Sequence, residues 1–304
     1  MSNELVGEVA VRRALEAAGV RPSKRLGQNF LVDPRTATDV VDIVRAENPA
    51  GAVIEIGAGL GALTLPLAAQ VERLVALEID RRLARRMQEL LAPRAGTIEI
   101  LQQDVLEYDF DAAAAAWGDR LVVVGSTPYS ITAPILKKLI DGRAAIRSAY
   151  LITQREVAEK ILASPSRAGT ALGIFVQAYA DVAILRRIPR SAFYPVPEVD
   201  SCLWRLAMRA KPRFTSSESS FFAVVRAIYG ARRKTLRNAL QRALPADVVG
   251  EVLVKSGLDG GVRGETLGFA ELDALATAAH VFLLQGTDGI EHGESAEPSG
   301  RGLP

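Results

Sequence analysis

Three glycines at alternate positions, Gly57, Gly59 and Gly61, lie between a short apolar stretch and a segment that reads as the start of a helix. Glycine removes every side chain where a backbone must bend sharply and approach a ligand closely, and it leaves amide groups facing that ligand. The segment is therefore typical of a turn that binds a nucleotide cofactor. Gly57, Gly59 and Ala62 also satisfy the dinucleotide pattern G-x-G-x-x-G/A, so the glycines alone leave a nicotinamide cofactor open.

Three acids near predicted strand ends favour a different cofactor. Glu55 stands two residues before Gly57, where a carboxylate would repel a pyrophosphate but suits a cation such as the sulfonium and amine of S-adenosylmethionine. Glu78 ends a second predicted strand and can accept both hydrogen bonds of a ribose diol, and Asp104 follows a third strand. We therefore predict S-adenosylmethionine, with its adenosine held across a doubly wound sheet. Taken singly, Glu78 and Asp104 could instead be helix caps or solvated loop acids.

A short polar segment, Ser126-Thr127-Pro128-Tyr129, follows a fourth predicted strand. An exocyclic amine on a base is a poor nucleophile because its lone pair is delocalised into the ring. Methylating it requires hydrogen-bond acceptors that hold the amino group, and an aromatic face that grips the flipped base. Backbone carbonyls near Thr127 and Pro128 can accept, and Tyr129 can stack. The alternative is an ordinary proline turn with a core tyrosine.

The elements that must position these residues alternate between strand and helix from residue 33 to about residue 209. Asp33-Pro34 predicts the start of a helix that runs to about Glu47. Further helices are predicted at 154–163 and 170–179, and seven strands near 52–56, 73–79, 98–102, 121–125, 149–153, 182–188 and 199–208. The last two strands are expected to form an antiparallel pair. This order predicts an α/β fold with a sheet covered by helices on both faces.

The composition changes at residues 211–220, and beyond them the chain is predicted to be helical to about Leu284. Between Arg226 and Arg242, six basic residues fall within seventeen positions and no acid interrupts them. A charge run is usually a solvated helix face, but this one suits a phosphate backbone. We predict a methyltransferase domain over residues 1–209, a helical RNA-binding domain over 210–285, and a disordered tail over 286–304.

Composition and residue counts limit the remaining possibilities. The chain has 304 residues, of which 49% are hydrophobic and 24% are charged, so there is room for one large domain and a small one. Its apolar runs are broken by charge before about 18 residues, and residues 1–19 read as an amphipathic helix rather than a signal peptide. With one cysteine, Cys202, and two histidines, no intrachain disulfide can form and no metal site is expected. We expect a cytoplasmic protein without a membrane partner.

The chain resembles the KsgA-type ribosomal RNA small-subunit adenine N6,N6-dimethyltransferases in five separated segments that occur in the same order. These segments are Lys24 to Leu31, the glycine turn from Glu55 to Thr64, Gln103-Asp104, Phe193 to Ser201, and Arg232 to Asn238. The resemblance implies a Rossmann-like class I S-adenosylmethionine-dependent methyltransferase with a seven-stranded mixed sheet, followed by a small all-α C-terminal domain.

The resemblance also assigns roles to residues. It implies a cofactor site lined by Gln28, Asn29, Leu31, Glu55, Gly57, Gly59, Gly61, Glu78, Asp104 and Ser126, with Glu78 on the ribose hydroxyls and Asp104 on the adenine amine. Phe193 would help hold the target base. The implied substrate is a pair of adjacent adenosines in a small-subunit rRNA hairpin loop of an immature 30S particle, each methylated twice by a monomeric enzyme. The RNA backbone would be bound by Arg226, Arg232, Arg233, Lys234 and Arg237.

One position departs from the family pattern. The family usually has Asn-Leu-Pro-Tyr where this chain has Ser126-Thr127-Pro128-Tyr129. Losing one well-placed acceptor costs about 10²–10³ in rate, so we expect slow turnover, or a water bridge from Ser126. Three alternatives therefore stay open: a ribosome-assembly factor without activity, a large-subunit rRNA adenine methyltransferase and, more distantly, a nicotinamide oxidoreductase.

Overall fold

The computed structural model describes residues 7–23, 27–48, 52–94, 97–127, 131–163 and 169–285. By its internal contacts the chain divides into two compact units. One comprises Met1–Ala163 and Phe175–Pro212, and the other Ser164–Ile174 and Arg213–Pro304. The segment Ser164–Ile174 thus groups with the second unit, although the sequence placed it in the first domain. The expected tail, residues 286–304, lies outside the described residues.

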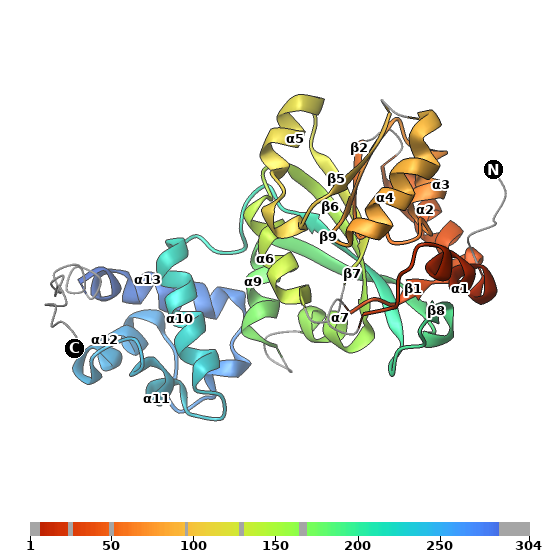
Figure 1. The fold of residues 1–304 in the computed structure, drawn as a ribbon. Helices are drawn as coiled ribbons and strands as arrows, with labels where there is room; N and C mark the ends of the chain where they lie inside the picture. Colours follow the sequence, from red (N-terminus) through yellow and green to blue (C-terminus); the bar gives the residue numbers. More distant parts are fainter. Residues whose placement is uncertain are drawn as a thin grey trace, which may run out of the picture. The chain divides into compact units, whose positions relative to one another are not determined.

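The first unit contains the predicted seven-stranded mixed sheet, and its strands lie in the order β4-β3-β2-β5-β6-β9-β7 (Figure 1). The strands are β2 (Ala52–Ile56), β3 (Arg73–Glu78), β4 (Ile98–Gln102), β5 (Leu121–Ser126), β6 (Ile146–Gln154), β7 (Ala180–Ile188) and β9 (Ser201–Met208). The first five are parallel, and β9 runs antiparallel to both β6 and β7. The order in which strands are added to the sheet reverses between β2 and β5: β3 and β4 lie on one side of this pair, and β6 lies on the other. The edge between β2 and β5 is therefore the topological switch point, where α/β sheets bind ligands.

Helices cover both faces of this sheet, which explains why its central strands are continuous apolar runs. On one side lie α2 (Pro34–Glu47), α3 (Thr64–Ala68) and α4 (Arg81–Leu91), and on the other α5 (Phe110–Trp117) and α6 (Thr132–Asp141) (Figure 1). The expected start of α2 is confirmed, because the Asp33 side chain caps it by accepting a hydrogen bond from the Thr36 amide. Two further helices, α7 (Arg155–Leu162) and α9 (Ala171–Tyr179), follow β6.

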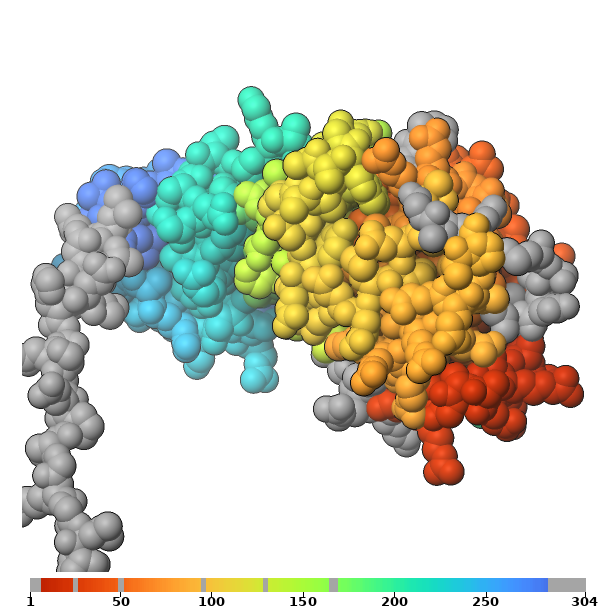
Figure 2. Space-filling model, turned by 45° about the horizontal axis from the view of Figure 1, so that its top comes forward, coloured from red at the N-terminus to blue at the C-terminus, as the bar shows by residue number. Residues whose placement is uncertain are grey.

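A two-stranded ribbon that the sequence did not predict joins the N-terminal region to the loop before β9. Strand β1 (Phe30–Leu31) pairs antiparallel with β8 (Phe193–Tyr194). The expected N-terminal amphipathic helix is present as α1 (Glu8–Ala17), and its apolar face packs against Leu83 of α4. Figure 2 shows the red surface of this helix beside the orange surface of the α4 region. The Arg12 guanidinium lies 4.7 Å from the centre of the Tyr194 ring, which ties α1 to the ribbon.

The described part of the second unit is built from helices with one isolated β-bridge, between Thr235 and Arg263. Its principal helices after Pro212 are α10 (Glu218–Gly230), α11 (Leu236–Leu240), α12 (Ala246–Ser256) and α13 (Phe269–Gln285). The ring of Phe221 stacks between those of Phe214 and Phe269 and anchors the core of this unit. Across the described ranges of both units, no helix combines the length and apolar character needed to cross a membrane.

Candidate functional site: an acidic pocket at the carboxyl edge of the sheet

Four neighbouring parallel strands end in polar residues at the same edge of the sheet. Asp104 follows β4, Glu78 ends β3, Glu55 precedes the last residue of β2, and Ser126 ends β5. Because the order of these strands is β4-β3-β2-β5, the three carboxylates and the serine form a row across the edge. Loops after these strand ends enclose a pocket that all four residues line.

Most of the residues predicted for the site from the sequence line this pocket. They are Gln28, Asn29, Leu31, Glu55, Gly57, Gly59, Glu78, Asp104, Ser126, Thr127 and Phe193. Two others, Pro128 and Tyr129, lie outside the described residues. The described lining contains three carboxylates and no lysine, arginine or histidine. The pocket therefore suits a ligand that carries positive charge near at least one of these acids.

The glycine turn differs from the sequence-based expectation in one respect. All three glycines have positive φ, at 79°, 55° and 89°, so the turn requires them. Their amides, however, already donate hydrogen bonds of 2.8 Å within the protein: Gly57 to the Leu77 carbonyl, Gly59 to Glu78 Oε2, and Gly61 to the Ala58 carbonyl. At these positions the turn has no free amide to bind a phosphate group. This argues against a dinucleotide cofactor and favours a cofactor that carries no phosphate.

Gly61 is not among the residues that line the pocket. A Cβ added at Gly61 would lie 2.8 Å from the terminal methyl of Met87, and also close to Leu65. Its role is close packing of the turn against α4, so the structure does not bring it to the predicted cofactor site. Gly59 lies against the ribbon and not against α4, because a Cβ at Gly59 would lie 3.6 Å from the Phe30 ring of β1. The ribbon thus approaches the turn from the pocket side.

Glu78 is buried, and both of its oxygens are engaged. Oε2 accepts from the Gly59 amide at 2.8 Å, and Oε1 accepts from the Asp80 amide at 2.9 Å. Burial raises the pKa of Glu78, while these amide hydrogen bonds oppose the rise. Each oxygen retains a lone pair, so the carboxylate can still accept two hydroxyl groups.

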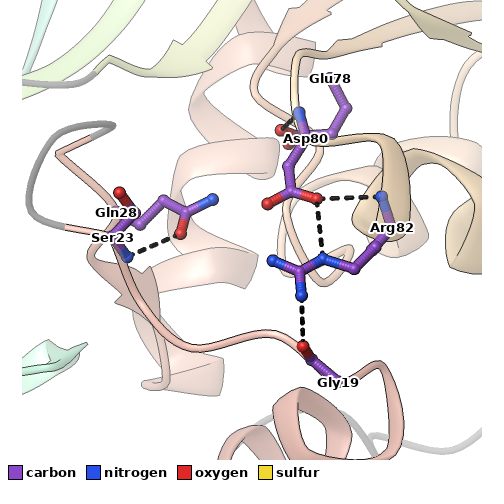
Figure 3. Close-up of polar contacts among 6 residues, drawn as sticks. All are labelled: Gly19, Ser23, Gln28, Glu78, Asp80 and Arg82. Carbon is purple, nitrogen blue, oxygen red and sulfur yellow. Dashed lines mark hydrogen bonds and ion pairs between the residues drawn. The ribbon is translucent and has the colours of Figure 1, made fainter.

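Figure 3 shows the contacts that lead from Glu78 to the N-terminal region. Arg82 donates to the Gly19 carbonyl at 2.5 Å, and the Asp80 side chain accepts from the Arg82 amide at 2.9 Å. On the opposite side of the view, Gln28 Oε1 accepts from the Ser23 amide at 2.9 Å. The Arg82–Gly19 contact holds the segment before β1 against the start of α4, and the Gln28–Ser23 contact lies within that segment.

Glu55 has a different environment from Glu78. Its side chain is only 1% exposed, and its Oε2 has no hydrogen-bond partner among the described residues. Burial raises the pKa of Glu55 to about 8, with a smaller contribution from the neighbouring Glu78 charge, and a hydrogen bond with Thr64 partly offsets the rise. A buried carboxyl with an unpaired oxygen needs either a proton or a cation.

Asp104 both caps a turn and lines the pocket. Its Oδ1 accepts from the Leu106 amide at 2.9 Å and starts the short 3₁₀ helix Val105–Glu107. The capping interpretation considered from the sequence is therefore correct for one oxygen, while the residue still borders the cavity.

At the end of β5, Ser126 and Thr127 play different parts. Thr127 is 2% exposed and donates to the Ile152 carbonyl from both its amide, at 3.1 Å, and its hydroxyl, at 3.4 Å. Its hydroxyl is thereby engaged with β6, and Ser126 beside it also lines the pocket. The preceding Gly125 was missed from the sequence: a Cβ there would lie 2.6 Å from the Ile56 carbonyl oxygen. Glycine at this position allows β5 to approach β2 closely.

Two hydrophobic residues complete the pocket. Phe193, in strand β8 of the ribbon, is 2% exposed and lines the pocket. Ile79 also lines the pocket and is 50% exposed, although the core excludes most side chains of its size from solvent. The sequence interpretation missed Ile79. Its position directly after the strand-end acid Glu78 was the available signal.

The five basic residues predicted to bind RNA all lie in the second unit and are exposed: Arg226, Arg232, Arg233, Lys234 and Arg237. The structure shows an acidic residue close to this basic run that is distant from it in the sequence. Glu265 lies 3.6 Å from the Arg232 guanidinium and accepts from the Arg233 amide at 3.2 Å. Arg233 itself has a φ of 70°, an unusual conformation for a residue with a side chain. Glu265 therefore helps to fix the turn that presents this basic run.

Comparisons with known proteins point to one family. The family model described as ribosomal RNA adenine dimethylase matches residues 20–266. Proteins named ribosomal RNA small subunit methyltransferase A are similar along nearly the whole chain. The one from Geobacillus kaustophilus is 40% identical over 278 residues, which cover 88% of this chain and 94% of that protein. The one from Pelotomaculum thermopropionicum is 39% identical over 286 residues, with the same coverage of 88% and 94%.

Solved structures give the same fold. The 23S rRNA methyltransferase ErmE is 26% identical, with a TM-score of 0.63 over 82% of this chain and 99% of that one. A dimethyladenosine transferase from Plasmodium falciparum has a TM-score of 0.67 over 83% of this chain and 98% of that one, at 21% identity.

Proposed function

The chain belongs to the ribosomal RNA adenine dimethylase family, and on this basis we propose that it transfers methyl groups from S-adenosylmethionine to N6 of two adjacent adenosines in a small-subunit (16S) rRNA hairpin loop. Each adenosine would receive two methyl groups. The observation that carries the proposal is the acidic pocket, whose three carboxylates lie in a row without a neighbouring cation in the described lining. It fits a cofactor that combines a ribose, an adenine amine and a sulfonium.

The order of the strands supports a role for each acid. Glu78, with one lone pair left on each oxygen, suits the two ribose hydroxyls. Asp104 lies on one side of it and suits the adenine amine, and Glu55 lies on the other side, toward β5. The exposed Ile79 provides an apolar surface next to Glu78 for a flat base. This arrangement leaves the methionyl part of the cofactor toward Glu55 and Ser126.

Methyl transfer would take place beside the carboxyl end of β5. Bound S-adenosylmethionine supplies a methyl group made electrophilic by its sulfonium. This chain would hold the adenine amine beside that methyl group through the Ser126 hydroxyl and the main chain after it. Hydrogen-bond acceptors at this point favour the amine as its nitrogen becomes tetrahedral and loses a proton. Phe193, a buried residue of the ribbon at the pocket wall, would hold the base.

The second unit would bind the rRNA backbone. Its exposed run of Arg226, Arg232, Arg233, Lys234 and Arg237 supplies the positive charge that phosphate contacts require. We propose an immature 30S particle as the physiological substrate and a monomeric enzyme acting in the cytoplasm. The choice of the small subunit rests on the relatives at 37–40% identity, which carry that name.

Methylation of large-subunit rRNA is the second candidate function, because the structure of ErmE is similar over most of this chain. Incubation of the purified protein with labelled S-adenosylmethionine and either immature 30S or 50S particles separates the candidates. We expect label in 16S rRNA only. Label in 23S rRNA would support the second candidate, and tight binding to 30S particles without any label would identify a ribosome-assembly factor.

A further inference from the structure

Glu55 is the most deeply buried of the three acids that line the pocket. Glu78 accepts two amide hydrogen bonds and Asp104 accepts one, but Oε2 of the fully buried Glu55 has no hydrogen-bond partner among the described residues. The cost of an isolated buried carboxylate is large enough that such groups take up a proton instead.

Among the described residues that line the pocket around Glu55, none carries a positive charge. From β3, the Glu78 carboxylate opposes ionisation, and from α3 the neutral hydroxyl and amide of Thr64 favour it without cancelling the effect of burial. From β5, Ser126 is neutral. The described residues that line the pocket include no basic side chain. Since no described residue supplies a positive charge to Glu55 in the pocket, a ligand would bring it.

The position of Glu55 indicates which part of the cofactor would bring that charge. Adenine and ribose are assigned to Asp104 and Glu78, on β4 and β3. Glu55 lies one strand further along the edge, next to β5. The methionyl part carries both cationic groups of S-adenosylmethionine, the sulfonium and the ammonium, and on this assignment it is the part nearest to Glu55.

We propose that Glu55 is protonated in the ligand-free enzyme and releases this proton to solvent when the methionyl cation of S-adenosylmethionine enters the pocket. The proton leaves as the carboxylate gains its counter-ion, so binding of one cofactor is coupled to loss of one proton. Burial, which raises the pKa of Glu55 to about 8, keeps the group mostly neutral at pH 6.5 before binding. The inference deepens the proposed function and rests on it, because it presumes this cofactor.

Two consequences follow for the wild-type enzyme. At pH 6.5, binding of S-adenosylmethionine should release about one proton. Between pH 6 and pH 7 the dissociation constant should fall about tenfold, because the proton that must be displaced becomes easier to lose. The cofactor's own α-amino group titrates near pH 8, so this window avoids it.

Isothermal titration calorimetry at pH 6.5 measures the released proton directly. Titrating S-adenosylmethionine in phosphate, PIPES and imidazole buffers gives the number of protons exchanged as the slope of observed enthalpy against buffer ionisation enthalpy. We expect a slope equivalent to about one proton for the wild type and close to zero for Glu55→Gln. Glu89→Gln, a change at an exposed acid paired with Arg85 on α4, serves as the matched control and should keep the wild-type slope.

The outcomes separate this inference from the proposed function. Cofactor binding without proton release, or proton release that persists in Glu55→Gln, would overturn the role of Glu55 while leaving the methyltransferase assignment intact. Failure of the wild type to bind S-adenosylmethionine would contradict the proposed function itself. If Glu55→Gln binds too weakly for calorimetry, equilibrium dialysis with labelled cofactor at pH 6 and pH 7 gives its pH dependence, which should be flat.

Discussion

At the residue scale, the site depends on which polar groups the protein satisfies internally. The glycine turn resembles a phosphate-binding turn in sequence, yet its three glycine amides are bonded to the chain itself. The neighbouring acids carry the cofactor preference instead. The types of these acids and their positions at strand ends could be predicted from the sequence. The unpaired oxygen of Glu55 could not, because it depends on what β3, β5 and α3 place around it.

Ser126 is the residue where this chain departs from the family pattern. Its side chain is one heavy atom shorter past Cβ than asparagine and presents a hydroxyl instead of an amide oxygen. We expect Ser126→Asn to raise the turnover number on immature 30S particles by about 10², with little change in S-adenosylmethionine affinity. Single-turnover methylation with labelled cofactor measures this. Equal rates in the two proteins would show that serine is a sufficient acceptor.

The substitution Gly125→Ala tests whether β5 must approach β2 closely. An alanine Cβ would lie 2.6 Å from the Ile56 carbonyl oxygen, and backbone cannot move aside cheaply. We expect Gly125→Ala to lower the free energy of unfolding by about 3 kcal/mol, measured by urea denaturation. Gly250→Ala in α12 is the control: nothing lies within 4 Å of its added Cβ, so it should be neutral or stabilising by up to about 1 kcal/mol. A Gly125→Ala variant as stable as the wild type would contradict this packing.

At the element scale, the long strands were predictable and the short ribbon was not. All seven sheet strands fall where alternation of apolar runs and turns predicted them. The ribbon of β1 and β8 has two residues in each strand, and their partners are more than 160 positions apart, so no periodicity could reveal it. This ribbon nevertheless provides the wall of the pocket that contains Phe30, Leu31 and Phe193.

The contact between Arg82 and the Gly19 carbonyl, 2.5 Å long, ties the N-terminal segment to α4. Arg82→Gln should weaken this tie and let the segment open more often, because a charge-assisted hydrogen bond is lost. We expect faster hydrogen exchange in residues 8–20 and a cofactor dissociation constant raised about fivefold, which corresponds to about 1 kcal/mol.

Arg85→Gln is the matched control for that change. Arg85 lies on the same helix and pairs with Glu89 on it, one turn away. Its substitution should leave both the exchange rates and the affinity unchanged. If Arg82→Gln behaves like this control, the segment does not depend on the Arg82 contact.

At the scale of the whole molecule, the two units would divide the work between chemistry and RNA binding. The basic character of the second unit was visible in the sequence as a run without acids. The ion pair between Arg232 and Glu265 could not be predicted from the sequence, because Glu265 lies 33 positions after Arg232 and approaches it only in the folded unit. The boundary was also incompletely predicted, since Ser164–Ile174 groups with the second unit while the chain around it belongs to the first.

The proposed RNA surface predicts a salt dependence. Arg233→Gln and Lys234→Gln should each weaken binding of a small-subunit rRNA fragment and reduce the slope of log K against log salt by about one. Affinity for S-adenosylmethionine should not change. Lys255→Gln in α12, where the lysine pairs with Glu251 one turn away, is the control within the same unit. An unchanged slope in all three variants would place the RNA contacts elsewhere.

The central claim is that this chain dimethylates two adjacent adenosines of small-subunit rRNA. Mass spectrometry of 16S rRNA fragments from cells with and without the protein tests it most directly. We predict two neighbouring N6,N6-dimethyladenosines when the protein is present and two unmodified adenosines when it is absent, with 23S rRNA identical in both. An unchanged 16S rRNA, or a difference confined to 23S rRNA, would contradict the account.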